Sequence, residues 1–227
     1  MEIVYALIES KGIVNYAFQN CYRLKKIAIP SSITFIGEYG FDECESLAEI
    51  MIPESVTYIG AFAFNNCSSL IEIILPSSVC SIEESTFSGC SSLKSVIIPS
   101  SVTTIEESAF KNCTSLAELI IPSSITSIGS HAFSGCSSLA KIIIPSSITS
   151  ISDYCFNECV SLAEIELPDS IISIGIFSFC KCSSLKEVII PPLVDCISDA
   201  AFKGCSSLEY VTIPENVKVF GKFSFYG

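Results

Sequence analysis

A proline recurs every 23 residues along this chain, and this step constrains the fold more than any other feature of the sequence. The prolines stand at Pro30, Pro53, Pro76, Pro99, Pro122, Pro145, Pro168, Pro191 and Pro214. No insertion or deletion interrupts the step, which also connects phenylalanines from Phe18 to Phe225, cysteines from Cys21 to Cys205 and leucines from Leu24 to Leu208. Four columns in one register identify an internal repeat and predict a stack of similar structural units.

Each segment of the repeat has a physical interpretation, shown here for residues 93–113. In "LKSVIIP" apolar residues alternate at Val96 and Ile98 before a proline, which predicts a short strand. Val102 and Ile105 point inward from a second extended segment, and "EESAFKNC" predicts a single helical or 3-10 turn that packs Phe110 beneath the coil. One unit cannot bury its apolar face alone, so stacked neighbours must cover it, and a solenoid with a parallel sheet follows.

The unit L-x-x-I-x-I-P-x-S-V-T-x-I-x-x-x-A-F-x-x-C-x-S resembles the BspA-like leucine-rich repeat family over about residues 15 to 225. The resemblance implies a leucine-rich repeat solenoid: a right-handed β/α superhelix with a parallel β-sheet face, short second strands and short helical or 3-10 turns. We expect a single domain over residues 1–227 with about nine repeats. Its N-terminal repeat is degenerate, since Leu7 takes the proline position, and its C-terminal repeat is incomplete after "KFSFYG".

The charge and hydropathy of the chain exclude two classes of partner. The formal net charge of -12 lacks the Lys/Arg surface that binds nucleic acid. No apolar run approaches the roughly 20 residues that cross a bilayer, and no signal peptide is visible in "MEIVYALIES". The family resemblance implies a cell-surface or secreted location and a function in adhesion or protein binding, without enzyme activity.

Nine of the 13 cysteines share one repeat position, and Cys80, Cys155, Cys180 and Cys196 lie outside it. A structural zinc site needs clustered pairs, whereas this column supplies one ligand per coil. Stacked coils lie about 4.8 Å apart, near the separation that a disulfide tolerates, but side chains in register point parallel to one another. We therefore interpret the thiols as small buried hydrophobes with a weak donor, and expect no metal and no cofactor.

Candidate catalytic residues are few. The one histidine, His131, occupies a variable repeat position that often holds an aromatic ring, which favours a surface histidine. The serines lie in Ser-Ser turns, where hydroxyls satisfy local backbone groups, and none lies in a nucleophile elbow or a phosphate-binding loop. We predict a non-enzymatic protein.

Function must then reside at the outward positions of the first strands, which vary while the inward positions hardly do. One outward column is mainly acidic and the next is mainly Ile, so an acidic row lies beside an apolar row, interrupted by Glu166. An exposed apolar row of this length is typical of a protein-binding or self-association surface, although strands also favour β-branched residues for their own sake. The predicted site is Glu49, Met51, Glu72, Ile74, Ile97, Glu118, Ile120, Lys141, Ile143, Glu164, Glu166, Glu187, Ile189 and Tyr210. Its acidic side chains favour a basic or mixed-charge protein partner, such as a host-cell or matrix protein.

Two alternatives stay open. A hydroxyl ladder on the second extended segment suits a carbohydrate-binding or structural array, although solvated β-propensity explains it equally; its threonines are Thr34, Thr57, Thr103, Thr126 and Thr149. No polar cap follows Val217, Phe220 and Phe225, so the chain is also interpreted as a self-associating segment of a larger surface protein, through the sheet face or through open ends.

Overall fold

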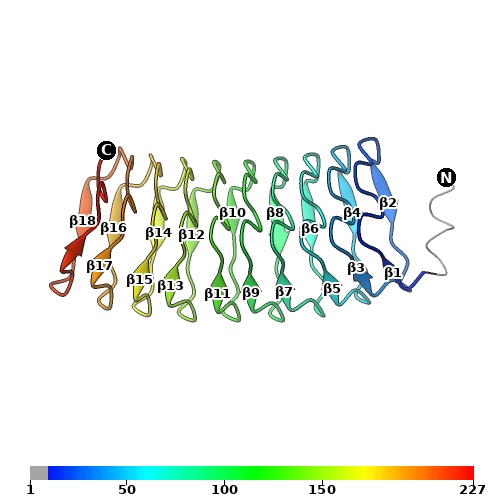
Figure 1. Cartoon of the computed structure of the whole chain (residues 1–227), viewed down its shortest axis with the longest axis horizontal. Helices are drawn as coiled ribbons and strands as arrows, with labels where there is room; N and C mark the ends of the chain where they lie inside the picture. Colours follow the sequence, from blue (N-terminus) through cyan, green and yellow to red (C-terminus); the bar gives the residue numbers. More distant parts are fainter. Residues whose placement is uncertain (1–9) are drawn as a thin grey trace.

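The computed structural model describes residues 10–227, which form an elongated stack of about nine coils with the first and last described coils at opposite ends of the long axis (Figure 1). The Leu7 position of the degenerate first repeat lies outside the described residues. One strand of each coil, here called a face strand, starts two residues after the repeat leucine. The face strands are β2 (Lys26–Ala28), β4 (Glu49–Met51), β6 (Glu72–Ile74), β8 (Ser95–Ile97), β10 (Glu118–Leu119), β12 (Lys141–Ile143), β14 (Glu164–Glu166), β16 (Glu187–Ile189) and β18 (Tyr210–Thr212).

A two-residue second strand follows the proline turn in each coil. These strands are β1 (Gly12–Ile13), β3 (Phe35–Ile36), β5 (Tyr58–Ile59), β7 (Ser81–Ile82), β9 (Thr104–Ile105), β11 (Ser127–Ile128), β13 (Ser150–Ile151), β15 (Ser173–Ile174), β17 (Cys196–Ile197) and β19 (Val219–Phe220). All pairings between strands are parallel and join residues 23 apart, such as Lys141 with Glu164. The predicted parallel stack, and its register, are confirmed.

The face strands do not form one continuous sheet. They pair as β2-β4, β6-β8, β10-β12-β14 and β16-β18, with no strand pairing across β4/β6, β8/β10 and β14/β16 in the described structure. We call these three positions the sheet breaks. The repeat leucines, such as Leu93, remain buried on either side of them, and so do the middle strand residues, such as Val96, except for the partly buried Ile165 of β14.

The segment between the second strand and the cysteine corrects the sequence-based prediction, because no helix is assigned in residues 10–227. Instead, alternate N–H groups bond three residues back within the coil and outward to the following coil. In one coil the outward bonds run from Ser108 to Ser130, from Phe110 to Ala132 and from Asn112 to Ser134, at 2.7–2.9 Å. Three such bonds join every adjacent pair of coils from Tyr16 to Tyr226 without interruption. We call this part of each coil the turn segment.

Two columns of left-handed residues make this alternation possible. One is the position of His131 (φ 58), and the other is the residue before the repeat cysteine, such as Asn112 (φ 59) or Gly135 (φ 76). A residue with positive φ reverses the direction of the next N–H, so the segment cannot continue as a helix. Gly135 leaves room for the Asn112 side chain, since a Cβ there would lie 2.2 Å from Asn112 Oδ1.

The core between the two sets of strands is built on the phenylalanine column. Ten rings from Phe18 to Phe225 stack with centroids 5.1–5.7 Å apart and planes within 13° of parallel. The rings from Phe41 to Phe202 are almost fully buried. Since one ring covers the next, each coil supplies the apolar surface that its neighbour lacks.

The repeat cysteines lie beside this column and act as hydrogen-bond donors. From Cys44 to Cys205, each thiol donates to the carbonyl oxygen of the phenylalanine in the preceding coil at 3.1–3.2 Å, as Cys113 Sγ does to Phe87. All described cysteines are free, and burial raises the pKa of Cys90 and Cys136 to about 12. The column therefore holds protonated thiols that fill space and join coils. Cys155 and Cys180, outside the column, are buried too, while Cys80 is exposed.

Candidate protein-binding face

The outward side chains of the face strands form one surface of the stack. In β4, β8 and β12 the middle residue is buried and the two flanking residues are exposed, as the alternation of a strand dictates. The apolar row, defined as Met51, Ile74, Ile97, Ile120, Ile143 and Ile189, has exposed fractions from 54% to 85%. All 14 residues of the predicted site are exposed on this surface.

The acidic row, defined as Glu49, Glu72, Glu118, Glu164 and Glu187, is neutralised at two places only. Lys26 Nζ lies 2.7 Å from Glu49 Oε2, and this hydrogen bond and charge lower the pKa of Glu49. Lys141 Nζ lies 3.0 Å from Glu164 and 3.5 Å from Glu166, which raise the pKa of Lys141. Glu72, Glu118 and Glu187 have no ion pair in the described structure, so the row keeps a net negative charge.

A hollow lies at two of the three sheet breaks. At β8/β10 it measures about 340 Å³ and is lined by Ile97 and Ile120 with Ser95 and Glu118 at its side. At β14/β16 it measures about 620 Å³, and its lining combines four carboxylates with Lys186 and apolar residues; the carboxylates are those of Glu164, Glu166, Asp169 and Glu187. A third hollow, of about 610 Å³, extends from β2 to Glu72 and includes Met51. The breaks thus give the face one apolar hollow and one acidic hollow.

Sequence reasoning missed three charged residues that line these hollows. Lys94 borders the apolar hollow, and Asp169 and Lys186 border the acidic one. Lys94 and Lys186 precede the first outward column by one position, and Asp169 follows the repeat proline. Their repeat positions could have identified them as neighbours of the site. The sequence does not indicate where the sheet breaks lie, so it could not place these residues beside a hollow.

The hydroxyl ladder on the second extended segment is largely engaged within the stack. The hydroxyls of Thr57, Thr103 and Thr126 donate to carbonyl oxygens of the preceding coil at 3.3 Å, and Thr34 does so at 2.9 Å. Four of the ladder's five threonine hydroxyls thus donate within the stack, and that of Thr149 makes no such bond in the described structure. The hydroxyl ladder therefore has a structural role, which is to join adjacent coils, and this role does not require a carbohydrate ligand.

Side chains with metal-binding potential do not cluster in residues 10–227. No group of three or more His, Cys, Asp and Glu side chains that could hold a metal ion is found there. His131 is half-buried rather than a free surface residue: its ring stacks on Tyr154 at 4.5 Å and its Nδ1 has no hydrogen-bond partner. Burial is the main cause that lowers the pKa of His131. This environment suits a neutral stacked ring.

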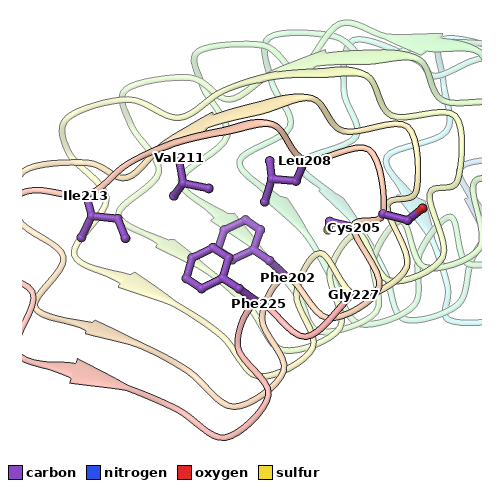
Figure 2. Close-up of a pocket in the computed structure, with 8 residues that line it drawn as sticks. Phe202, Cys205, Leu208, Val211, Ile213, Phe225 and Gly227 are labelled. Atoms are coloured by element: carbon purple, nitrogen blue, oxygen red, sulfur yellow. The ribbon is translucent and has the colours of Figure 1, made fainter.

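The end of the stack at the last coil exposes core residues. Figure 2 shows the stacked rings of Phe202 and Phe225 facing Leu208 and Val211 across a hollow of about 450 Å³. Ile213 also lines it and is 40% exposed. This apolar hollow belongs to the end of the core: it is lined by Val211, the middle residue of β18, and not by the outward residues of that strand.

The repeat and the fold now define the class of protein: a leucine-rich repeat solenoid. The BspA type leucine rich repeat model matches residues 11–126 and 103–227 in six copies, and the chain belongs to this family. No protein of curated function matches the sequence significantly. Residues 10–227 contain no helix that is long and apolar enough to cross a membrane.

Solved structures of bacterial leucine-rich repeat proteins have the same fold. A leucine-rich repeat protein from Bacteroides ovatus is 30% identical, with a TM-score of 0.60 over 88% of this chain and 72% of that one. The leucine-rich repeat protein of T. pallidum is 29% identical, with a TM-score of 0.53 over 93% and 74%. A protein described as a leucine rich cell surface protein from Faecalibacterium prausnitzii is 27% identical, with a TM-score of 0.51 over 93% and 83%.

Proposed function

We propose that this chain is a non-enzymatic, single-domain recognition scaffold of the cell surface or a secreted protein, which binds a protein partner through its face strands. The observation that carries the proposal is the apolar row, in which five successive coils from Met51 to Ile143 present exposed Met or Ile. Contiguous exposed apolar side chains rimmed by charge are characteristic of protein-binding surfaces. Family membership and the surface protein of F. prausnitzii support the location.

The proposed partner is basic or of mixed charge. The unpaired carboxylates of Glu72, Glu118 and Glu187 attract a cationic surface and raise its rate of association. The acidic hollow at β14/β16 suits a Lys or Arg side chain, and the hollow between Ile97 and Ile120 suits an apolar one. A host-cell or matrix protein with such a surface would use the chain as an adhesive contact.

The test replaces Ile97 and Ile120 with Lys and compares the binding of purified matrix proteins and host-cell extracts with that of the wild type. Both side chains are exposed, so the buried columns stay intact and the unfolding midpoint should not change. We expect binding to fall at least about tenfold, because two charges enter the apolar contact. Higher salt should weaken the wild-type complex.

The matched control is Thr103→Lys with Thr126→Lys, which adds the same charges on the second extended segment of nearby coils. This variant should bind as the wild type does. If the threonine variant loses binding and the isoleucine variant keeps it, the site lies on the hydroxyl ladder and the proposal is wrong. A glycan array then tests the carbohydrate-binding alternative directly.

A further inference from the structure

A further hollow, none of whose lining residues belongs to a face strand, lies on the turn segments of the last coils. It measures about 450 Å³ and its walls come from four successive coils. The lining residues are Tyr154, Asn157, Glu158, Phe177, Cys180, Lys181, Lys203, Gly204, Tyr226 and Gly227. We call it the turn-side hollow.

Two columns beside the hollow carry small residues in one coil. The left-handed column that holds Tyr154 and Phe177 continues with Ala200, so the stack of rings stops there. The column of Glu158 and Lys181 likewise continues with Gly204. Elsewhere in the first column, consecutive rings lie 4.5–5.0 Å apart and cover one another. Ala200 itself is buried and does not line the hollow, so a ring at this position would have to displace neighbouring wall residues.

Two lysines give the hollow an unusual charge for an acidic protein. Lys181 Nζ lies 2.6 Å from Glu158 Oε1, so this pair is neutral overall. Lys203 forms no ion pair with any carboxylate in residues 10–227, and its Nζ lies 5.6 Å from the centre of the Phe223 ring. Burial raises the pKa of the Cys180 thiol. The charges of Lys181 and Lys203 oppose this rise, which is consistent with two ammonium groups near the hollow that both lysines line.

We propose that the turn-side hollow binds a small organic carboxylate with a flat apolar face. The flat face packs against Phe177 and Tyr226, and the carboxylate pairs with Lys203. An aromatic acid and a carboxylated sugar share this chemistry, since sugars also present an apolar face to aromatic rings. Inorganic phosphate carries the charge without the flat face, so it does not satisfy the site. The inference is independent of the proposed protein-binding face.

The experiment titrates the wild-type chain with each of four probes and measures binding by calorimetry and by saturation-transfer NMR. The probes are 1-naphthoate, its neutral amide 1-naphthamide, glucuronate and inorganic phosphate. We expect naphthoate or glucuronate to bind, and which of the two binds more tightly identifies the source of the carboxylate. The amide should bind at least about five-fold more weakly than naphthoate, because it lacks the charge that pairs with Lys203.

Two variants test the location. Ala200→Phe restores the missing ring, and it is compatible with the local backbone because Phe62 and Phe177 adopt the same left-handed conformation, with φ of 58° and 54°. Lys203→Ala removes the cation. Each variant should weaken binding at least about five-fold. The matched control is Lys111→Ala, at the same repeat position four coils earlier, which should leave binding unchanged.

Any of three results overturns the inference: equal binding of naphthoate and naphthamide, undiminished binding by both variants, or equal weakening by Lys111→Ala. Binding of phosphate alone overturns it too, since charge would then suffice. A thermal melt checks that Ala200→Phe folds, and Lys203→Ala decides the question if it does not. The protein-binding test on the face strands is unaffected by either outcome.

Discussion

The turn segments and the face strands belong to the same coils, yet adjacent coils are joined differently on the two sides. Between every pair of neighbouring turn segments there are three backbone hydrogen bonds, a thiol-to-carbonyl bond from Cys44 onward and a stacked phenylalanine pair. The face strands lose their pairing at three breaks. The difference indicates that the turn side holds the stack together, which leaves the outward positions of the face strands free to vary.

Raising the pH should have the largest destabilising effect on the turn side, because the buried thiols of the turn side must stay protonated. Cys44, Cys90, Cys136 and Cys205 have pKa values raised to about 12 by burial, against about 8.5 in an unfolded chain. Below about pH 8.5 these thiols contribute fully to the free energy of unfolding. Above that pH the unfolded chain loses protons that the native chain retains, so the contribution declines. The free energy of unfolding should fall by about 1.4 kcal/mol per pH unit for each thiol as the pH rises towards 12. For the four thiols together the fall is about 5 kcal/mol per pH unit.

Urea unfolding followed by circular dichroism from pH 7 to 11 measures this slope. Cys90→Ala should make the slope shallower by about 1.4 kcal/mol per pH unit, whereas Cys80→Ser, at an exposed thiol, should leave it unchanged. A free energy of unfolding that stays level to pH 11 would contradict the role assigned to the column.

A smaller but still large effect is expected from Phe110→Ala. The ring is fully buried and stacks on Phe87 and Phe133 at 5.5 and 5.7 Å, so its loss leaves a cavity between two coils. We expect a loss of about 3–5 kcal/mol in the free energy of unfolding. The comparison variant Ile97→Ala, on the face strands, should change it by less than about 0.5 kcal/mol. Similar losses in both variants would show that the two sides stabilise the stack equally.

The smallest effect concerns association of the 1–227 chain. The turn segments donate towards the following coil, and in the last coil the N–H groups of Phe223 and Phe225 have no acceptor within the described chain. Val219 and Phe220 of β19 are more than half exposed beside them. We expect weak, concentration-dependent self-association, detected as a rising sedimentation coefficient, because exposed apolar groups and unpaired strand edges favour contact.

Two variants separate the routes of association. Val219→Lys with Phe220→Lys should abolish it if the end of the stack is responsible, whereas Ile97→Lys with Ile120→Lys should abolish it if the apolar row is. A monodisperse monomer at the highest concentration would show that neither surface is adhesive to a second copy.

Much of this architecture could be predicted from the 23-residue step. A repeat without insertions fixes the register, so Lys141 opposite Glu164 and the two rows on the face strands followed from spacing alone. The buried cysteine column was predicted as filler, but its donation to carbonyl oxygens was not, since a weak S–H donor leaves no mark on the sequence.

The turn segment was predicted wrongly because "EESAFKNC" has the composition of a helical turn. Carbonyls of the following coil compete successfully for its N–H groups, an effect of stacking that local propensity does not include. A signal was present before the cysteine, where Gly89, Gly135 and Gly204 alternate with Asn66 and Asn112, residues that tolerate positive φ. The column of Tyr154 has no such signal, and the sheet breaks separate strands of ordinary composition.

The uninterrupted joints between turn segments have an evolutionary consequence. Because each coil offers the same three donors to the next and accepts the same three from the one before, a duplicated or deleted unit of 23 residues leaves two compatible surfaces to rejoin. Gene segments encoding whole coils can therefore be gained or lost without redesign of the core. Each such event lengthens or shortens the surface of the face strands by one strand, about 4.8 Å, so the length of the molecule is adjustable in fixed steps.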